Sequence, residues 1–247
     1  MIRRPPSEAL PGFVAAVEGR HSVRRFTTAP VPRDDVREMV RLATLAANAG
    51  NAQPWRFVAV DDRPLLSAMR AAVEGRLDEI AAWPEVQAAG LIRETRALRG
   101  YATFFAEAPL AIAVLGLPYE SHGDRLLALR SVSREERDRL RARPDLQSVG
   151  AAVQLLVTAA HVLGYGACWM SAPVLAAPRL EELLGVGEPA RLVAIGAVGV
   201  ASGRPQGTRR LPVDEVLRFA TSEPGAGSEP GRPAPAAEPT PGEPGRR

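Results

Sequence analysis

The sequence predicts one main domain of mixed helices and strands, in which helices cover both faces of a central sheet. Helical patterns alternate with short apolar runs along most of the 247 residues. These runs are nearly unbroken, as is typical of strands that are covered on both faces. The length leaves room for one sizeable domain, or at a stretch two small ones. The hydrophobic share of 46% and the charged share of 24% are ordinary for a soluble globular protein.

The expected elements follow from the apolar periodicity. Strands are expected at residues 56–60, 110–117, 167–170 and 192–200. Helices are expected at residues 7–19, 33–47, 63–82, 91–107, 123–143, 149–163 and 176–184. The second helix is the clearest, because Val36, Met39 and Val40 recur at helical spacing with charged residues between them. A Gly-Tyr-Gly triplet at residues 164–166 ends one helix and begins the next strand.

Residues 222–247 differ in composition from everything before them. Twelve of these 26 residues are Pro or Gly, and none is Val, Ile, Leu or aromatic. Such a segment buries too little apolar area to offset the entropy of ordering it. We therefore expect a domain over residues 1–221 and a disordered Pro/Gly-rich tail over residues 222–247.

The composition excludes several classes of site. All 31 basic residues are arginine, so chemistry that needs a Schiff-base lysine or a Walker lysine is excluded. The single cysteine, Cys168, forbids an internal disulfide framework, and three scattered histidines cannot form a zinc cluster without carboxylates. We expect no metal site.

Charge and hydropathy also limit the partners. The pI of about 9.7 invites a nucleic-acid function, but most arginines are interleaved with acids, as in residues 134–143. No aromatic platform accompanies them, so no nucleic-acid partner is expected. The apolar runs are far shorter than a membrane span, and no apolar signal segment opens the sequence. The expectation is a cytoplasmic protein without a membrane partner.

Two segments in the first quarter of the sequence are candidates for binding a ligand. Residues 20–26, Arg-His-Ser-Val-Arg-Arg-Phe, offer several donors that suit a phosphate or a polyol. The alternative is a basic helix end, where cations complement the helix dipole. Residues 47–55, Ala-Asn-Ala-Gly-Asn-Ala-Gln-Pro-Trp, combine small residues with amides, which lets a ligand approach the backbone. The alternative there is a plain helix-to-strand turn.

Two later segments have the same character. Residues 164–173 form a strand that ends in small residues and a proline, so backbone N–H groups there can face a ring system. Cys168 within this strand is expected to be buried and inert, and His161 before it to pack or cap. Residues 208–212, Thr-Arg-Arg-Leu-Pro, can clamp a phosphate or form a solvated turn.

The order and spacing of the four segments resemble the nitroreductase superfamily. The features are an Arg-His-Ser-Val-Arg opening, a turn ending in Gln-Pro-Trp about thirty residues later, a late glycine-containing strand and a C-terminal Arg-Leu-Pro. The resemblance covers about residues 12–220. It implies an α+β fold with three α-β-α layers, a central mixed and mainly antiparallel sheet, and a homodimer with FMN at the subunit interface.

The resemblance also implies the residues that bind the cofactor. Arg20, His21, Ser22 and Arg24 would hold the FMN phosphate, ribityl chain and pyrimidine edge. Ala47, Asn48, Ala49 and Asn51 would line the flavin of the partner subunit. Ser171 and Ala172 would face flavin N5, and Arg210, with Arg209 possible as a helper, would bind the phosphate.

The implied activity is hydride transfer from NAD(P)H to a small acceptor, such as a nitroaromatic or a quinone, by a ping-pong mechanism. No side chain would be a nucleophile or an obligatory base, because the flavin carries the chemistry. Residues 83–107 and 119–145 would cap the acceptor pocket. Its candidate wall residues are Trp83, Tyr101, Phe104, Phe105 and Tyr119, of which Phe104 and Phe105 are expected instead to be core.

Departures from the family pattern leave other functions open. Ala47 and Asn48 stand where members commonly have Pro-Ser, a phosphate-binding lysine is absent, and Ser-Ala-Pro at residues 171–173 replaces Glu-Gly. The last motif looks more like the Thr-Thr-Pro of the dehalogenase branch. The alternatives are a deazaflavin enzyme, a dehalogenase or dehydrogenase of one metabolite, a flavin-consuming benzimidazole synthase, and a flavin-binding or flavin-free protein without turnover.

The expected homodimer also rests on the long helices at residues 91–107 and 149–163. In the second of these, Val153, Leu156, Val157 and Ala160 form one apolar face, and Leu155 and Val162 extend it. That face exceeds what one sheet contact normally uses, which favours an interface between two copies. The alternative is that this helix is simply the buried central helix of a monomer.

Overall fold

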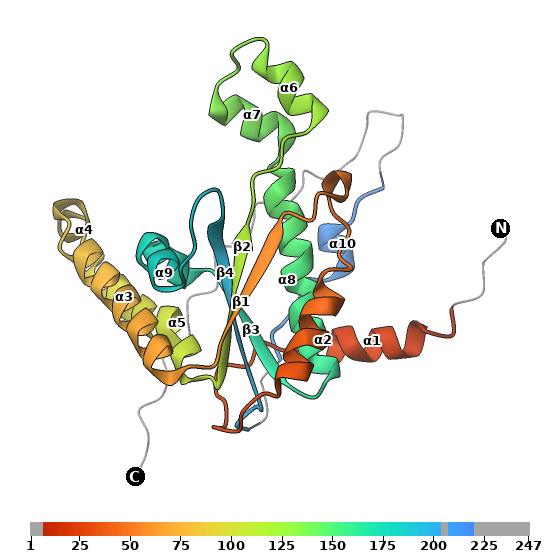
Figure 1. Ribbon diagram of the computed structural model, residues 1–247, viewed down its shortest axis with the longest axis vertical. Helices are drawn as coiled ribbons and strands as arrows, with labels where there is room; N and C mark the ends of the chain where they lie inside the picture. Colours follow the sequence, from red (N-terminus) through yellow and green to blue (C-terminus); the bar gives the residue numbers. More distant parts are fainter. Residues whose placement is uncertain (1–6, 204–206, 220–247) are drawn as a thin grey trace. The chain divides into compact units, whose positions relative to one another are not determined.

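A four-stranded sheet forms the centre of the computed structural model, which describes residues 7–203 and 207–219 (Figure 1). Its strands are β1 (Trp55–Val60), β2 (Leu110–Gly116), β3 (Gly166–Met170) and β4 (Arg191–Gly199). Their order is β1-β2-β4-β3, and each neighbouring pair is antiparallel. The predicted strands are confirmed to within one residue at each end. The prediction of a mainly antiparallel sheet is confirmed as well.

Helices cover both faces of this sheet. The packed elements on one face are α3 (Arg63–Ala81), α5 (Ile92–Thr103), η2 (Phe104–Glu107), η3 (Ala172–Ala176) and α9 (Ala177–Leu183). On the other face lie α2 (Arg33–Ala43) and α8 (Pro144–Val162). Side chains of β2 alternate between the two cores: Ala111 and Ala113 belong to the first, Ile112 and Val114 to the second. The predicted three-layer α-β-α arrangement is therefore confirmed.

The remaining elements are short. They are α1 (Leu10–Gly19), η1 (Ala49–Asn51), α4 (Pro84–Ala88), α6 (His122–Ala128), α7 (Arg134–Arg141) and α10 (Val213–Val216). The prediction of a continuous helix at residues 123–143 is wrong. Ser133 accepts a hydrogen bond from the backbone N–H of Glu136 and begins a second helix there, and Ser131 before it has a positive φ of 53°. The turn α4 was not predicted.

The long helix α8 begins five residues before the predicted start, at Pro144. A proline fits the first turn of a helix, where its missing N–H has no partner to lose. The apolar face of Val153, Leu156, Val157 and Ala160 is buried within the chain, packed in the core that α8 shares with α2 and the sheet. The expectation that this face forms a subunit interface is therefore wrong, because the protomer itself covers it.

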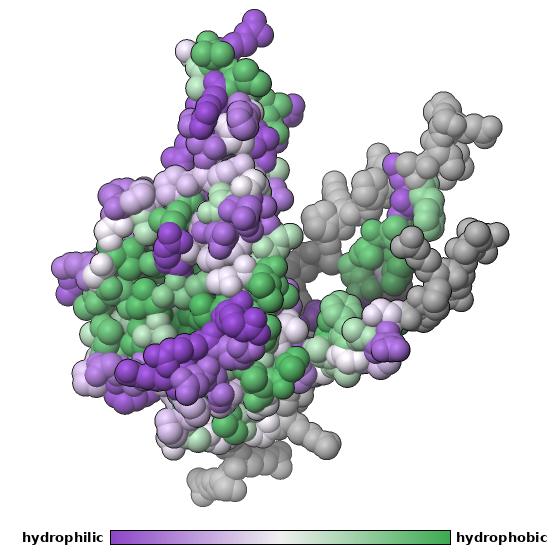
Figure 2. Space-filling model, turned by 45° about the vertical axis from the view of Figure 1, so that its right-hand side comes forward, coloured by the Kyte–Doolittle hydropathy of each residue, from purple (hydrophilic) through white to green (hydrophobic). Residues whose placement is uncertain are grey.

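Other apolar side chains stay exposed on the same side of the molecule. Leu155 and Val162 on α8 are 38% and 64% exposed. Helix α1 has no buried residue, and its Phe13 and Val17 are 65% and 50% exposed. Hydrophobic side chains also lie exposed at the tip formed by α6 and α7, at the top of Figure 2.

The described residues form two units. The first extends to residue 203, and the second, residues 207–219, contains α10 and is described by itself. The expected tail at residues 222–247 lies outside the described residues. Within the described part of the chain, no helix is both long and apolar enough to cross a membrane.

We predict that Leu156→Ala lowers the free energy of unfolding by about 2–5 kcal/mol, because it opens a cavity under a fully buried side chain. Leu156 lies over Gly196 of β4, with its Cδ2 atom 3.7 Å from the position that a Cβ on Gly196 would occupy. Urea denaturation measures the loss. Leu129→Ala, at a side chain that is 82% exposed, is the control and should cost less than about 1 kcal/mol. Equal losses in both variants would contradict the assignment of α8 to the core.

Candidate functional site

Residues 20–27 run along the outer edge of the sheet. Ser22 forms a parallel bridge with Ala167 of β3, and the Val23 N–H donates to the Ala167 carbonyl at 3.0 Å. Further on, the Thr27 N–H donates to the carbonyl of Val200 at 2.8 Å, just past β4. The parallel bridge adds the mixed character that was expected of the sheet. The backbone of this predicted motif is thus held by the two last strands in the sheet order.

Two glycines allow this close approach. A Cβ on Gly166 would lie 2.7 Å from the Cβ of Val23, and one on Gly199 would lie 3.2 Å from the Phe26 ring. The contact at Gly166 is too short for any side chain, so residue 166 needs glycine for Val23 to reach β3. At Gly199 the Phe26 ring would have to shift slightly, and the shortest contact there is 2.6 Å, with Pro109. The sequence predicted Gly166 only as a strand start; its role in seating Val23 depends on a contact between distant segments.

Ser22 bridges Ala167, the neighbour of Cys168 on β3, and the Arg24 side chain lies beside Ser22, donating to its carbonyl at 3.4 Å. The Cys168 thiol is buried, and burial raises its pKa above the ordinary value. The charge of Arg24, a hydrogen bond with the Ser22 hydroxyl and the charge of Arg20 act in the opposite direction. The expectation that the Cys168 thiol is buried is confirmed. Three of the four residues predicted in the opening motif therefore share one place.

The fourth residue, His21, is half-buried, whereas Ser22 and Arg24 are exposed. Arg20 is the C-cap residue of α1, so the alternative of a basic helix end also describes it correctly. His161 of α8 lies against the last turn of α1, where a Cβ on Gly19 would come within 2.8 Å of its Nε2 atom. The packing role expected for His161 is confirmed.

The side-chain amide of Asn48 stabilises the turn at residues 47–53. The Asn48 side chain accepts from the Gln53 N–H at 2.8 Å and donates to the Ala46 carbonyl at 3.1 Å. Gly50 and Asn51 adopt positive φ angles of 59° and 51°. Asn48 is thus engaged in shaping the turn, while Ala47 and Asn51 are exposed. The sequence did not predict this internal use of Asn48.

Side chains outside the turn hold it on one side. The N–H of Ala49 donates to the buried Ser148 hydroxyl at 3.1 Å, and that hydroxyl donates to the Pro144 carbonyl at 2.6 Å. A Cβ on Gly50 would come within 2.7 Å of the Tyr119 hydroxyl, so Tyr119 lies directly against the turn. Ser148 and Tyr119 are therefore functional candidates that sequence patterns alone did not connect to this turn.

One chain does not bring the turn and the opening motif together. Ser148, which holds the turn, and His161, which contacts the end of α1, are 13 residues apart on α8, or about 20 Å. The turn also precedes β1, while the opening motif lies beside β3 at the opposite edge of the sheet. A single small ligand cannot reach both within one chain.

Ser171 and Ala172 follow the last paired residue of β3. Ser171 is four residues beyond Ala167, which places it about 13 Å along the strand direction from the Ser22 bridge. Between them, Trp169 is 42% exposed and its ring approaches Gly150 of α8. The edge of β3 therefore offers an elongated surface with cationic side chains at one end and free backbone at the other.

The other predicted residues are placed as follows. Arg209 and Arg210 are exposed in the second unit, which is described by itself. Phe104 and Phe105 are buried in the core, as expected. Trp83 and Tyr101 are 42% and 43% exposed.

The segment of α6 and α7, expected to cap a pocket, is held by charged groups. Arg141 contacts Asp124 at 3.3 Å and donates to the Ser121 hydroxyl at 2.5 Å. Hydrogen bonds from Ser121 are the largest cause that lowers the pKa of Asp124, and Arg141 adds to it. Asp124 therefore stays ionised and keeps this segment closed on itself.

Comparison with known proteins finds one matching family model and several relatives that match short stretches of the sequence. The sequence model described as the Nitroreductase family matches residues 17–200. A putative NAD(P)H nitroreductase of Streptococcus pyogenes is 39% identical over 51 residues, which are 21% of this chain and 26% of that protein. A 5,6-dimethylbenzimidazole synthase of Rhodospirillum rubrum is 43% identical over 51 residues, 21% of this chain and 24% of that protein. These matches span about a quarter of the relatives' length.

Solved structures resemble a much larger part of the chain. A BluB-like flavoprotein from Clostridium difficile 630 has a TM-score of 0.76 at 27% identity, over 85% of this chain and 99% of that chain. An FMN- and NADPH-dependent nitroreductase from a sphigopyxis species has a TM-score of 0.60 at 20% identity, over 84% of this chain and 98% of that chain. The second likeness shows the fold alone.

We predict that Gly166→Ala destabilises the protein by about 1–3 kcal/mol, because the added methyl group overlaps Val23. Val23→Gly, which also removes the Cβ of residue 23, should relieve that overlap, so the double variant should be more stable than the sum of the two losses by roughly 0.5–3 kcal/mol. Unfolding free energies of the four proteins in urea measure this coupling. Gly187→Ala is the control, because no atom lies within 4 Å of the Cβ it would add. Strictly additive losses would show that Val23 and Gly166 do not pack as described.

Proposed function

Because the chain belongs to the nitroreductase family, we propose that it is an FMN-dependent oxidoreductase that passes hydride from NADH or NADPH to a small acceptor, such as a nitroaromatic or a quinone. The observation that carries the proposal is the fixing of residues 20–27 on β3, which gathers Arg20, Ser22 and Arg24 in one place. An FMN- and NADPH-dependent nitroreductase among the similar structures supports the same cofactors.

The residues present fit the cofactor. Two guanidinium groups and a hydroxyl form a donor set suited to a phosphate and a polyol chain, and the exposed Ser22 and Arg24 are accessible to it. The elongated edge of β3 ends at Ser171 and Ala172, whose backbone is free of strand pairing. We assign the phosphate, ribityl and pyrimidine-edge contacts to Arg20, His21, Ser22 and Arg24, and the contact at flavin N5 to the backbone of Ser171 and Ala172.

In this mechanism the protein binds and orients FMN and the acceptor, and FMN, when bound, supplies the two-electron chemistry. Arg24 places positive charge where negative charge grows on reduction. Cys168 lies beneath the site, but its raised pKa keeps it a neutral thiol and not a nucleophile. The segment of α6 and α7 narrows access to the acceptor. Arg209 and Arg210 are proposed as further phosphate ligands.

The proposed site is completed by a second copy of the chain. The opening motif and the turn at residues 47–53 lie too far apart within one protomer to share a ligand. The exposed apolar side chains of α1, together with Leu155 and Val162, supply a surface for association. In the homodimer, Ala47, Asn48, Ala49 and Asn51 of one chain line the cofactor of its partner, and Asn48 contributes mainly by holding the turn.

A second candidate function is favoured by two of the similar proteins. One similar structure is a BluB-like flavoprotein, and one matched relative is a 5,6-dimethylbenzimidazole synthase. In that case the chain would consume reduced flavin and not recycle it. The two functions differ in the fate of the flavin once reduced protein meets oxygen.

The purified protein should be yellow, and NADPH should bleach its visible flavin absorbance without air. Readmitting air should restore the absorbance in the oxidoreductase, because the cofactor is only reoxidised. Permanent loss of flavin with release of a benzimidazole would favour the second candidate. A protein that binds no flavin at all would contradict both and favour a deazaflavin cofactor or a protein without turnover.

Arg20→Ala should weaken FMN binding about ten- to hundred-fold, because a charge-assisted hydrogen bond contributes about 1.5–3 kcal/mol. Titration of the apoprotein with FMN, followed by flavin fluorescence, measures the change. Arg37→Ala is the matched control, since Arg37 is an exposed arginine on α2 that pairs with Asp34. If Arg20→Ala and Arg37→Ala retain FMN equally, the phosphate site is not at Arg20.

Light scattering near micromolar concentration should show a dimer. Phe13→Glu should shift the protein toward monomer and release FMN together, because it charges an exposed apolar side chain of α1, whereas Phe13→Leu should not. Asn51→Trp should keep the dimer and lose FMN, since it fills space at the partner's cofactor. A folded monomer that holds about one FMN per chain would contradict the shared site.

A further inference from the structure

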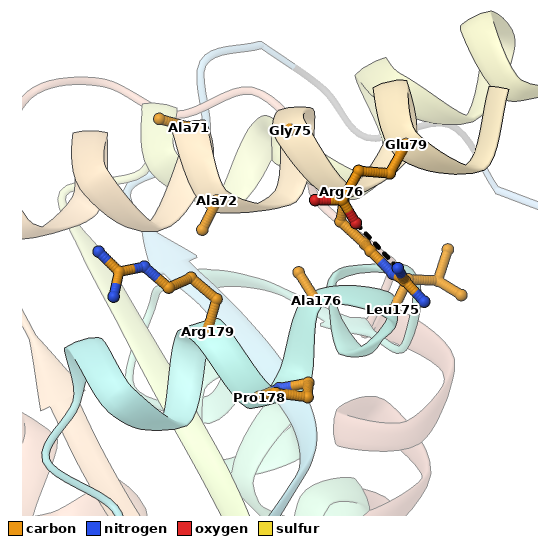
Figure 3. Close-up of a pocket in the computed structure, with 9 residues that line it drawn as sticks. All are labelled: Ala71, Ala72, Gly75, Arg76, Glu79, Leu175, Ala176, Pro178 and Arg179. Carbon is orange, nitrogen blue, oxygen red and sulfur yellow. Dashed lines mark hydrogen bonds and ion pairs between the residues drawn. The ribbon is translucent and has the colours of Figure 1, made fainter. Parts of the chain in front are cut away.

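A pocket of about 530 Å³ lies between α3 and the η3–α9 segment (Figure 3). Its lining residues are Ala71, Ala72, Gly75, Arg76, Glu79, Leu175, Ala176, Pro178 and Arg179. None of them belongs to the proposed cofactor site, and α3 and α9 lie on the face of the sheet opposite α8. The volume falls in the range of about 300–1,000 Å³ that is typical of small-molecule sites.

The floor of the pocket is apolar and made of small residues. Ala72 and Gly75 of α3 face Ala176 and Pro178 across it. Gly75 is an interior residue of a 19-residue helix, where glycine weakens the helix. Among residues 7–203 and 207–219, no atom lies within 4 Å of the position that a Cβ on Gly75 would occupy, so packing in this part of the chain does not require glycine there. The glycine keeps the pocket open.

The two arginines lie at opposite ends of the pocket and each pairs with a glutamate, but only the glutamate of Arg76 lines the pocket. Their side chains lie toward opposite ends, with Ala72 and Ala176 between them (Figure 3). Arg76 contacts Glu79, itself a lining residue, at 2.9 Å and lies over the Trp83 ring at 5.3 Å. Arg179 pairs at 2.5 Å with Glu182, which is not among the lining residues.

The Arg179 guanidinium is available to a ligand. Arg179 and Glu182 are 58% and 68% exposed, and exposed ion pairs of this kind hold their partners weakly. A carboxylate that enters the pocket can pair with Arg179 from the side opposite Glu182, because Glu182 does not line the pocket. At the other end, Arg76 already pairs with Glu79, so a second carboxylate there would have to compete with a lining acid for Arg76.

We propose that this pocket binds a small organic monocarboxylate. Its carboxylate pairs with Arg179, for which the planar guanidinium offers a two-point contact. Its apolar body lies on Ala72, Gly75 and Ala176 and ends near Leu175. The site is independent of the proposed cofactor site and needs no flavin.

Ligand-observed NMR titration of the full-length protein tests the charge pattern with three matched probes. Hexanoate should bind with a dissociation constant on the order of 1 mM, as expected for a ligand of this size. Hexanamide, which has no charge, should bind about tenfold more weakly. Hexanedioate should also bind more weakly than hexanoate, because its second carboxylate has to compete with Glu79 for Arg76. Equal affinity for hexanoate and hexanamide, or no binding of hexanoate, overturns the proposal.

Variants locate the binding. Arg179→Gln should weaken hexanoate binding about tenfold and remove its advantage over hexanamide. Arg70→Gln is the control, because Arg70 lies on the same helix and pairs with Glu74 outside the pocket. Gly75→Leu should abolish hexanoate binding by filling the pocket while it keeps the helix. Melting curves of Gly75→Ala and Gly75→Leu check the fold. Hexanoate affinity unchanged by both Arg179→Gln and Gly75→Leu overturns the assignment to this pocket.

Discussion

The close packing of α8 on the sheet sets the distances between all parts of the candidate site. Leu156 lies over Gly196, so the helix packs closely on β4. The rest of its apolar face packs against α2. Each end of the helix then holds a different functional segment. Ser148 near its start binds the turn before β1, and His161 near its end contacts the last turn of α1. The helix therefore keeps these two segments apart within one chain.

The apolar patterns of the sequence predicted the strands well and the helix ends less well. The strands were predicted to within one residue because runs such as residues 110–117 are apolar on both sides of the backbone. Helix ends were less accurate, since they depend on single capping residues. Ser133 divides one predicted helix into α6 and α7, and Pro144 begins α8 earlier than its apolar periodicity suggests. Both signals are present in the sequence and are weaker than the periodicity around them.

The site was predictable in its parts and not in its assembly. The donors of residues 20–24 and the late strand at residues 166–170 were both singled out, and the structure joins them through Ser22 and Ala167. The seating of Val23 on Gly166 and the contact of Ser148 with Ala49 link residues far apart in sequence, so no local pattern reports them. Periodicity likewise showed that α8 has an apolar face but not that α2 and the sheet cover it.

The exposed surface of α1 links the stability of this helix to the position of Arg20. A helix that buries no side chain in its own chain adds little to cooperative folding, so its amide protons exchange with solvent early. Arg20 is the residue that caps this helix. A contact that stabilises the end of α1 therefore also fixes the position of Arg20. In the proposed FMN-binding dimer, assembly and cofactor binding would then be thermodynamically linked, so that each favours the other.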